Sequence, residues 1–132
     1  MKLKELLQLY RELSIVALME FPSLVEDTRI IDNKLRLFLV DGSYIDVWLS
    51  IKRIGTYAFH WERRSIDGSL YRYDNIPDRR ARRLRTFPRH LHEGSEEDIV
   101  ECDMGDEPKE ILRAFLRYVE GRLRFKADVE DV

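Results

Sequence analysis

Two runs of alternating apolar residues meet at an Asp-Gly pair in the first half of the chain. Leucine occupies every second position of Lys34–Val40, and Tyr44–Ile51 repeats this spacing with Ile, Val and Leu. Such alternation is typical of strands with one buried face, and Asp41-Gly42 between them is a strong hairpin signal because both turn positions favour positive φ. The sequence therefore predicts an antiparallel hairpin, one face of which needs a covering layer.

Two more strands are predicted downstream of this hairpin. Thr56–Arg64 places its aromatic residues on one face, and a further strand follows and ends before Pro77. A three-residue loop at Ile66–Gly68 is preferred, because it sets Trp61 opposite Tyr73 and pairs opposite charges across the strands. This register also sets His60 opposite Asp74, and it gives one polar face to His60, Glu62, Arg72 and Asp74.

Helical spacing of apolar residues marks the two ends of the chain. A helix is predicted over Leu3–Ala17 and should close near Pro22. A second helix should start at Pro108, with an apolar stripe over Ile111–Leu123. Short strands are also indicated at 86–92 and 99–102. The expected fold is α+β: an antiparallel β-meander of about four to six strands flanked by an N-terminal and a C-terminal helix, with one domain over 1–127 and a frayed acidic tail over 128–132.

The composition of the 132 residues is that of a globular protein, since 44% are hydrophobic and 36% are charged. The single cysteine, Cys102, excludes an internal disulfide and a multi-cysteine zinc site. Charged residues interrupt the leucine-rich segment Met1–Leu18, so neither a signal peptide nor a membrane span is expected. We therefore expect a cytoplasmic protein without a membrane partner.

A strip of positive charge lies between Tyr71 and His92, although the formal net charge of the chain is −2. Arginine matches phosphate oxygens with a planar fork, and the flanking aromatic rings could stack on unpaired bases. One reading is therefore a surface for nucleic acid or for an acidic protein partner. The other is an internal ion-pair network with the acidic run 93–107, and both readings remain open. The strip consists of Arg72, Arg79, Arg80, Arg82, Arg83, Arg85 and Arg89.

The chain has three histidines, and two of them form a His-x-His motif. In a strand, His90 and His92 point to the same face, and His60 with Asp74 is expected on a neighbouring polar face. Imidazole suits proton transfer near neutral pH, so His60, Asp74, His90 and His92 are the candidate catalytic residues. A metal site and a purely hydrogen-bonded structural role are the alternatives. The favoured reading assigns no metal ligand and no cofactor.

Several short strings occur in an order known from one family. They are Asp41-Gly42-Ser43, Tyr57 with His60 and Trp61, Arg72-x-Asp74-Asn75-x-Pro77, and Phe87-Pro88-x-His90-x-His92. Together they resemble the TumE family, the toxin half of a prokaryotic toxin–antitoxin pair, over residues 35–92. Relatives often carry extra histidines after the turn and in the last string, where this chain has Asp78-Arg79 and Arg89.

The resemblance implies a toxin-like protein that a cognate antitoxin neutralises, with a helix-turn-helix protein as one candidate type. Activity on RNA follows by analogy with other small toxins. The first hypothesis is thus a metal-independent ribonuclease: the arginines hold phosphates, His60 and His90 or His92 transfer protons, and Asp74 orients one imidazole. One alternative is a non-catalytic module that binds nucleic acid or an acidic protein through Arg79–Arg89. Another is a metal-dependent enzyme that uses all three histidines.

Overall fold

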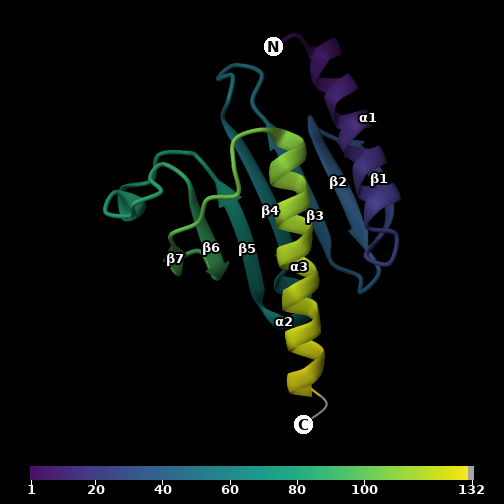
Figure 1. Cartoon of the computed structure of the whole chain (residues 1–132), viewed down its shortest axis with the longest axis vertical. Helices are drawn as coiled ribbons and strands as arrows, with labels where there is room; N and C mark the ends of the chain where they lie inside the picture. The colour runs from purple at the N-terminus through teal and green to yellow at the C-terminus, as the bar shows by residue number, and fades with distance from the viewer. Residues whose placement is uncertain (131–132) are drawn as a thin grey trace.

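The computed structural model describes the backbone of residues 1–130 and the side chains of residues 1–127. Seven antiparallel strands follow one another in a single sheet, in the order β1 to β7, with a long helix near each end of the chain (Figure 1). The predicted α+β meander is confirmed, with more strands than expected. The elements are α1 (Leu3–Glu20), β1 (Val25–Ile31), β2 (Lys34–Leu39), β3 (Tyr44–Leu49), β4 (Tyr57–Arg63), α2 (Arg64–Asp67), β5 (Ser69–Asp74), the 3₁₀ helix η1 (Arg79–Ala81), β6 (His90–Gly94), β7 (Ile99–Val100) and α3 (Pro108–Glu130).

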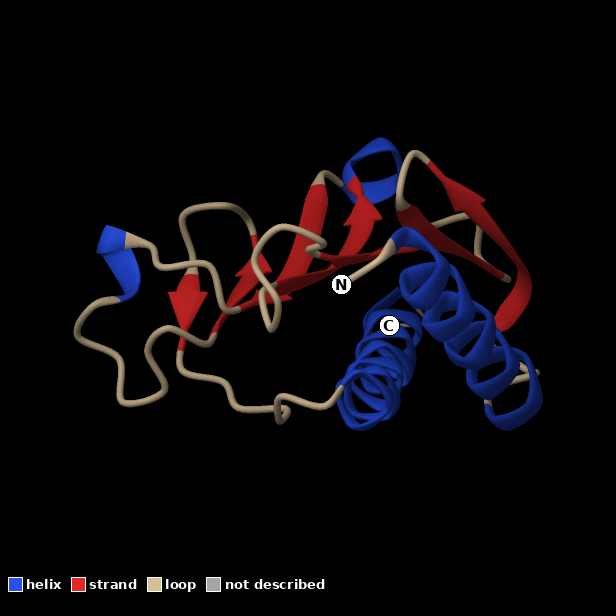
Figure 2. Cartoon of the chain, turned by 90° about the horizontal axis from the view of Figure 1, so that it is seen from above, coloured by secondary structure: helices blue, strands red, loops and turns tan. Residues whose placement is uncertain are grey.

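The two long helices form a layer on one face of the sheet (Figure 2). α1 ends at Glu20, two residues before Pro22, as the sequence predicts. α3 begins at Pro108, and the carboxylate of Glu107 accepts hydrogen bonds from the N–H groups of Lys109 and Glu110, which have no partner within the first turn of the helix. Of the acidic tail expected at 128–132, residues 128–130 continue α3 and residues 131–132 lie outside the described residues.

The hydrophobic core lies between these helices and the inward face of the sheet. Strands β2, β3 and β4 each bury every second residue, because side chains alternate between the two faces of a strand. Phe59 of β4 packs near Phe115 of α3, with the centres of the two rings 6.2 Å apart. The predicted apolar faces are confirmed, and the polar residues between them therefore lie on the opposite face.

The pairing of β4 with β5 differs from the predicted register by two residues. Trp61 lies opposite Tyr71 and stacks on it with ring centres 4.9 Å apart, and His60 lies opposite Arg72. A shift of two residues preserves the alternation of side chains between faces. The predicted polar face is therefore correct, although the pairs within it are different; it contains His60, Glu62, Arg72 and Asp74.

A helical turn between the two strands causes the shift. Arg64–Asp67 forms α2, and Gly68 closes it in the left-handed region with a φ of 79°. The side chain of Arg63 stabilises this turn, because it bonds to Asp67 within the turn and to Asp41 in the β2–β3 hairpin. The prediction of a three-residue loop is thus wrong, because the contact of Arg63 with Asp41 in a distant hairpin favours a longer connection.

The edge strand β1 has no counterpart among the elements predicted from the sequence. Its residues after Val25 are exposed or half-buried, so the alternation that marks the inner strands is weak here. The turn to β2 consists of Asp32 and Asn33, with φ values of 47° and 63°. Two consecutive residues with positive φ define a tight hairpin turn, and Asp-Asn in this position is a recognisable signal for one.

Candidate functional site on the open face of the sheet

A continuous row of polar side chains crosses the face of the sheet that the long helices leave uncovered. Residues that lie directly opposite each other on paired strands share a face. Through successive pairings from β2 to β6, the row contains Arg36, Asp46, His60, Arg72 and His92. Motifs that are far apart in the sequence therefore become neighbours on one surface.

A groove of about 560 Å³ runs along this row. Arg36 is held at its wall by an ion pair with Asp46 at 2.8 Å, and its guanidinium lies 3.9 Å from the centre of the Tyr44 ring. Cationic groups and aromatic rings in one groove are the combination that single-stranded nucleic acids require. The groove is lined by Lys34, Arg36, Tyr44, Asp46, Trp48, Ala58, His60, Glu62, Arg64 and Arg72.

His60 lies in this groove with a defined tautomer. Arg72 Nη1 lies 3.4 Å from His60 Nδ1, and a guanidinium only donates hydrogen bonds, so Nδ1 must be the acceptor. The neutral ring therefore carries its proton on Nε2, which donates to Glu62 Oε1 at 3.0 Å. General bases of the histidine type have this arrangement, in which a carboxylate, here Glu62, binds the protonated ring nitrogen and the other ring nitrogen, here Nδ1, carries a lone pair.

The pKa of His60 lies below its ordinary value of 6.5, chiefly because burial disfavours the charged ring; Glu62 opposes this shift and Arg72 adds to it. The unfolded chain then binds a proton that the folded chain does not. The His60 contribution to the free energy of unfolding is therefore complete above pH about 6.5 and falls as the pH drops toward the folded pKa. We expect NMR titration of the His60 ring, assigned with His60→Gln, to give a midpoint below 6.5. A midpoint above 7 would contradict this environment.

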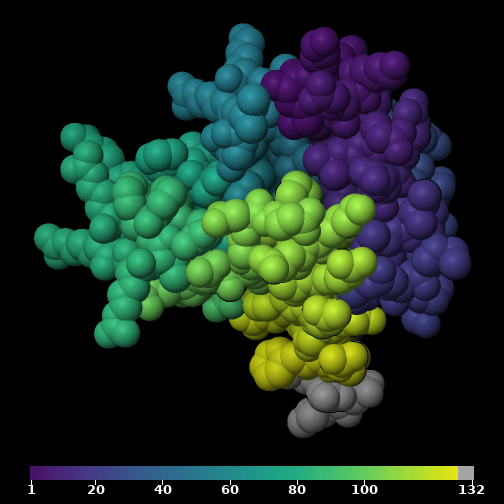
Figure 3. Space-filling model, turned by 45° about the horizontal axis from the view of Figure 1, so that its top comes forward, coloured from purple at the N-terminus to yellow at the C-terminus, as the bar shows by residue number. Residues whose placement is uncertain are grey.

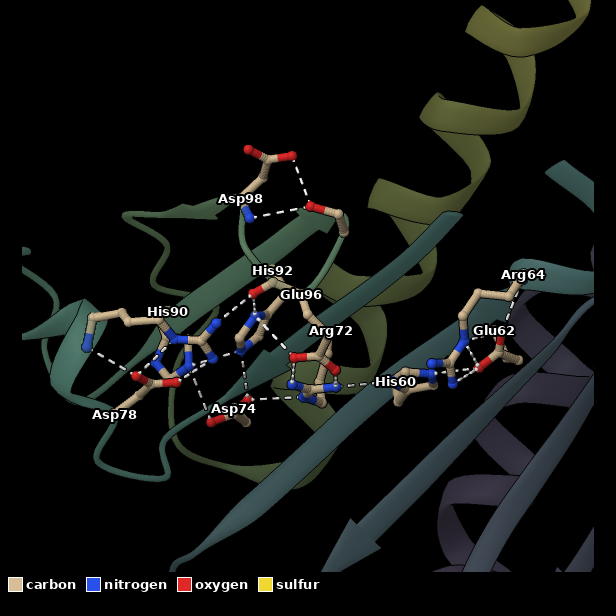
Figure 4. A network of polar contacts seen from close by, with 12 residues as sticks. His60, Glu62, Arg64, Arg72, Asp74, Asp78, His90, His92, Glu96 and Asp98 are labelled. Carbon is tan, nitrogen blue, oxygen red and sulfur yellow. Dashed lines mark hydrogen bonds and ion pairs between the residues drawn. The ribbon is translucent and has the colours of Figure 1, made fainter. Parts of the chain in front are cut away.

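Arg72 connects the groove to a buried cluster beside it (Figure 4). Its two terminal nitrogens bind both oxygens of Glu96 at 2.7 and 2.8 Å, and its Nε lies 3.2 Å from Asp74 Oδ2. The bidentate bond with Arg72 lowers the pKa of Glu96 to about 2. The three partners of Arg72 come from different elements: His60 from β4, Asp74 from β5 and Glu96 from the loop after β6. The side chain of Arg72 therefore fixes their relative positions.

The cluster behind Arg72 consists of Asp74, His90 and His92, which expose 3%, 1% and 1% of their surface. The Nε2 atoms of the two histidines lie 3.2 Å apart. His90 Nε2 is 3.3 Å from Asp74 Oδ1, and His92 Nε2 is 3.6 Å from Asp74 Oδ2. The three side chains thus point to a common centre, and their ligand atoms lie within 4.8 Å of one another, as a metal site would require.

Loops on both sides of β6 orient these two imidazoles. His90 Nδ1 bonds to the carbonyl of Pro88 at 2.8 Å, and His92 Nδ1 bonds to the carbonyl of Glu96 at 2.9 Å. A carbonyl only accepts, so both Nδ1 atoms carry hydrogen. The Nε2 atom of each neutral ring then presents a lone pair to the shared centre.

The arginine strip divides into paired and free members. The acidic run 93–107 neutralises only part of the strip, because its Glu96 binds Arg72 and its Asp103 and Asp106 bind Arg89. Arg80 is paired with Asp78, which lies outside that run. Residues 75–89 form a projection at the side of the molecule (Figure 3). Among the described residues, four exposed arginines of the projection take part in no ion pair: Arg79, Arg82, Arg83 and Arg85.

Of the residues proposed from the sequence, the structure brings together His60, Arg72, Asp74, His90 and His92. The arginines of the projection stand apart from this group. The groove residues Arg36, Tyr44 and Trp48 and the loop residue Glu96 were not recognised as functional residues. Arg36, Tyr44 and Trp48 alternate with the buried residues of their strands, so the signal for an outward position was present. The position of Glu96 depends on a loop that shows no periodic pattern.

A family model described as Toxin TumE matches residues 7–123, nearly the whole chain. The chain belongs to the TumE toxin family. The resemblance on short motifs is thereby confirmed and extends into both long helices. Membership implies a cognate antitoxin. Of the TumE motif residues named from the sequence, Asp74, His90 and His92 form the buried cluster, and His60 and Arg72 lie beside it on the open face. Tyr57 and Trp61 of the motif belong to the hydrophobic core instead.

No significant match was found among curated proteins or among solved structures. In the described part of the chain, every helix is too short or too polar to cross a bilayer.

Proposed function

We propose that this TumE-family toxin acts on RNA by cleaving a strand bound across the open face of the sheet. The observation that carries the proposal is His60, whose Nε2 hydrogen is bound by Glu62 and whose Nδ1 lone pair lies 3.4 Å from Arg72 Nη1, in a groove beside cationic and aromatic side chains. Single-stranded RNA offers the complementary groups, namely phosphates for the guanidiniums and unpaired bases for the rings.

Binding in this proposal uses two kinds of contact. Arg36, Arg64 and Lys34 line the groove and meet the phosphates, while Trp48 and Tyr44 provide half-buried aromatic faces for bases. The free arginines of the projection extend the positive surface beyond the groove and hold the strand at a second place. These arginines match phosphate because the planar guanidinium forms two parallel hydrogen bonds with it.

The reaction assigned to the groove is internal attack by a 2′-hydroxyl. When the strand binds, Arg72 Nη1 turns from His60 Nδ1 to a phosphoryl oxygen and frees the lone pair. His60 Nδ1 then takes the hydroxyl proton, the 2′-oxygen bonds to the adjacent phosphorus, and the P–O5′ bond breaks as water protonates the 5′-oxygen. The hydroxide that remains takes the proton from His60 and restores the neutral ring. Glu62 stabilises the imidazolium through the Nε2 hydrogen. Arg64 and Arg72 are placed at the groove to stabilise the charge that develops on the phosphoryl oxygens.

Asp74, His90 and His92 support this site from behind. Their burial keeps them from direct contact with a strand in the groove, and Asp74 binds the Nε of Arg72, which in turn contacts His60. The sequence-based role of His90 or His92 as a proton donor is therefore replaced in this proposal by a positioning role. A helix-turn-helix antitoxin and a cytoplasmic site of action remain part of the proposed function.

The chemistry of the sugar provides the test. Purified protein is incubated with a single-stranded RNA and with the same strand carrying one 2′-deoxynucleotide at the mapped cut. We expect cleavage of the RNA to 2′,3′-cyclic phosphate and 5′-hydroxyl ends, and no cleavage at the deoxy position, because the nucleophile is missing there. Equal cleavage of both strands would exclude this reaction.

A non-catalytic interaction module is the second candidate, and the four free arginines of the projection favour it. The test replaces Arg79, Arg82, Arg83 and Arg85 together by Gln, with Arg11→Gln on α1 as the control. If the module binds nucleic acid through the projection, the slope of log affinity against log salt should flatten by up to about 3, since each phosphate contact on a single strand contributes about 0.7. An unchanged slope would remove this candidate.

A further inference from the structure

We propose that Asp74, His90 and His92 bind one divalent transition-metal ion of the zinc class. The inference goes beyond the proposed RNA activity and does not depend on it. It rests on the convergence of the three side chains, on the orientation of each ring, and on the outer contacts that hold the carboxylate.

The convergence leaves a centre that needs a positive charge. Both Nε2 atoms present lone pairs, because both Nδ1 hydrogens are donated to backbone carbonyls. The Asp74 carboxylate, which only accepts when ionised, adds oxygens at 3.3 and 3.6 Å from these nitrogens. Three acceptors that face one another away from water repel unless a cation lies between them, and the cation is either a proton or a metal ion.

The spacing of the nitrogens fits a metal ion. Zinc binds imidazole nitrogen at about 2.0–2.1 Å in tetrahedral geometry, which places two such nitrogens about 3.3 Å apart. The observed separation of His90 Nε2 and His92 Nε2 is 3.2 Å. The side chains thus already have the spacing that coordination requires.

The outer contacts are those of a metal centre. Histidine ligands characteristically donate their second ring hydrogen to a carbonyl or carboxylate, which fixes the tautomer and the ring plane. His90 and His92 both do so, through Pro88 and Glu96. The carboxylate of Asp74 is fixed in turn by the N–H of Ile76 at 3.0 Å and by the Nε of Arg72 at 3.2 Å.

The ligand set selects the class of ion. Two imidazoles and one carboxylate suit zinc and its late first-row neighbours, whereas Mg²⁺ and Ca²⁺ prefer oxygen ligands alone. Three protein ligands leave the fourth tetrahedral position for water or another small ligand. The set differs from the three-histidine alternative raised by the sequence, since among the described residues the converging group includes Asp74 and not His60.

The test measures metal directly and needs no RNA. The full chain is stripped with a chelator, reloaded with Zn²⁺ or Co²⁺, and assayed by elemental analysis and by the visible absorption of tetrahedral Co²⁺. We expect one ion per chain and a Co²⁺ spectrum of the tetrahedral class. Asp74→Asn and His92→Gln should weaken Zn²⁺ binding by more than about 100-fold, since loss of an outer partner alone costs 10–100-fold.

His60→Gln is the matched control, because it removes the one histidine outside the cluster and should bind Zn²⁺ as the parent does. Circular dichroism identifies any variant that fails to fold, and Asp74→Asn preserves side-chain shape and the acceptor for Ile76. A parent chain without bound ion or Co²⁺ spectrum would overturn the proposal and assign the centre to a shared proton. Equal Zn²⁺ affinity in the parent, Asp74→Asn and His92→Gln would overturn it as well. Failure of RNA cleavage would affect only the proposed function.

Discussion

Arg72→Met should lower the free energy of unfolding by about 3 kcal/mol, a large part of the 5–15 kcal/mol typical of a domain. Arg72 holds Glu96 with two hydrogen bonds and contacts the buried carboxylate of Asp74. Methionine has nearly the same length without the charge, so the variant leaves Asp74 buried without its cationic partner. The value lies at the low end for a broken buried pair because 22% of the Arg72 side chain remains exposed.

Two further variants make this experiment specific. Arg72→Lys keeps the charge and loses the planar fork, so its loss of stability should be intermediate. Arg82→Met changes an exposed arginine of the projection and should stay within about 0.5 kcal/mol of the parent. Urea denaturation with an unchanged m-value provides the comparison. If Arg72→Met and Arg82→Met have the same midpoint, the Arg72 network contributes nothing to the fold.

Local patterns were sufficient for most of the sheet. The alternation in β2, β3 and β4 identifies the buried face without knowledge of the helices, because the period of two is a property of the strand itself. The register between β4 and β5 could not be predicted from local patterns. It depends on α2, which Arg63 supports through Asp41 in another hairpin, and no pairing rule based on neighbouring residues includes that contact.

For the candidate site, the sequence predicted which residues share a face but not how deeply they are buried. The spacing of His90 and His92 implies that they share a face of the sheet. His60 and Asp74 were correctly predicted to share a face although the register was wrong, because a shift of two residues does not change the face to which a side chain points. Full burial of the two histidines was not predictable. It arises from loops whose carbonyls, at Pro88 and Glu96, turn the rings toward Asp74. The division of the arginine strip likewise depends on which acidic loop residues reach it.

His60→Gln should reduce RNA cleavage by about 100-fold or more while the fold remains intact. A positioned general base contributes 10²–10⁴-fold, and glutamine cannot accept a proton from a hydroxyl at neutral pH. Glutamine can still bond to Glu62 and Arg72, so the groove should keep its shape. Arg29→Gln is the matched control, because Arg29 lies opposite Arg36 on the same face and does not line the groove.

The central claim is that the open face of the sheet is the active surface. The most direct measurement is the rate at which purified His60→Gln cleaves RNA, compared with the rates of the parent and of Arg29→Gln. If the open face is the active surface, the parent and Arg29→Gln cleave at similar rates and a folded His60→Gln variant is nearly inactive. A folded His60→Gln variant that cleaves RNA as fast as the parent would contradict the claim.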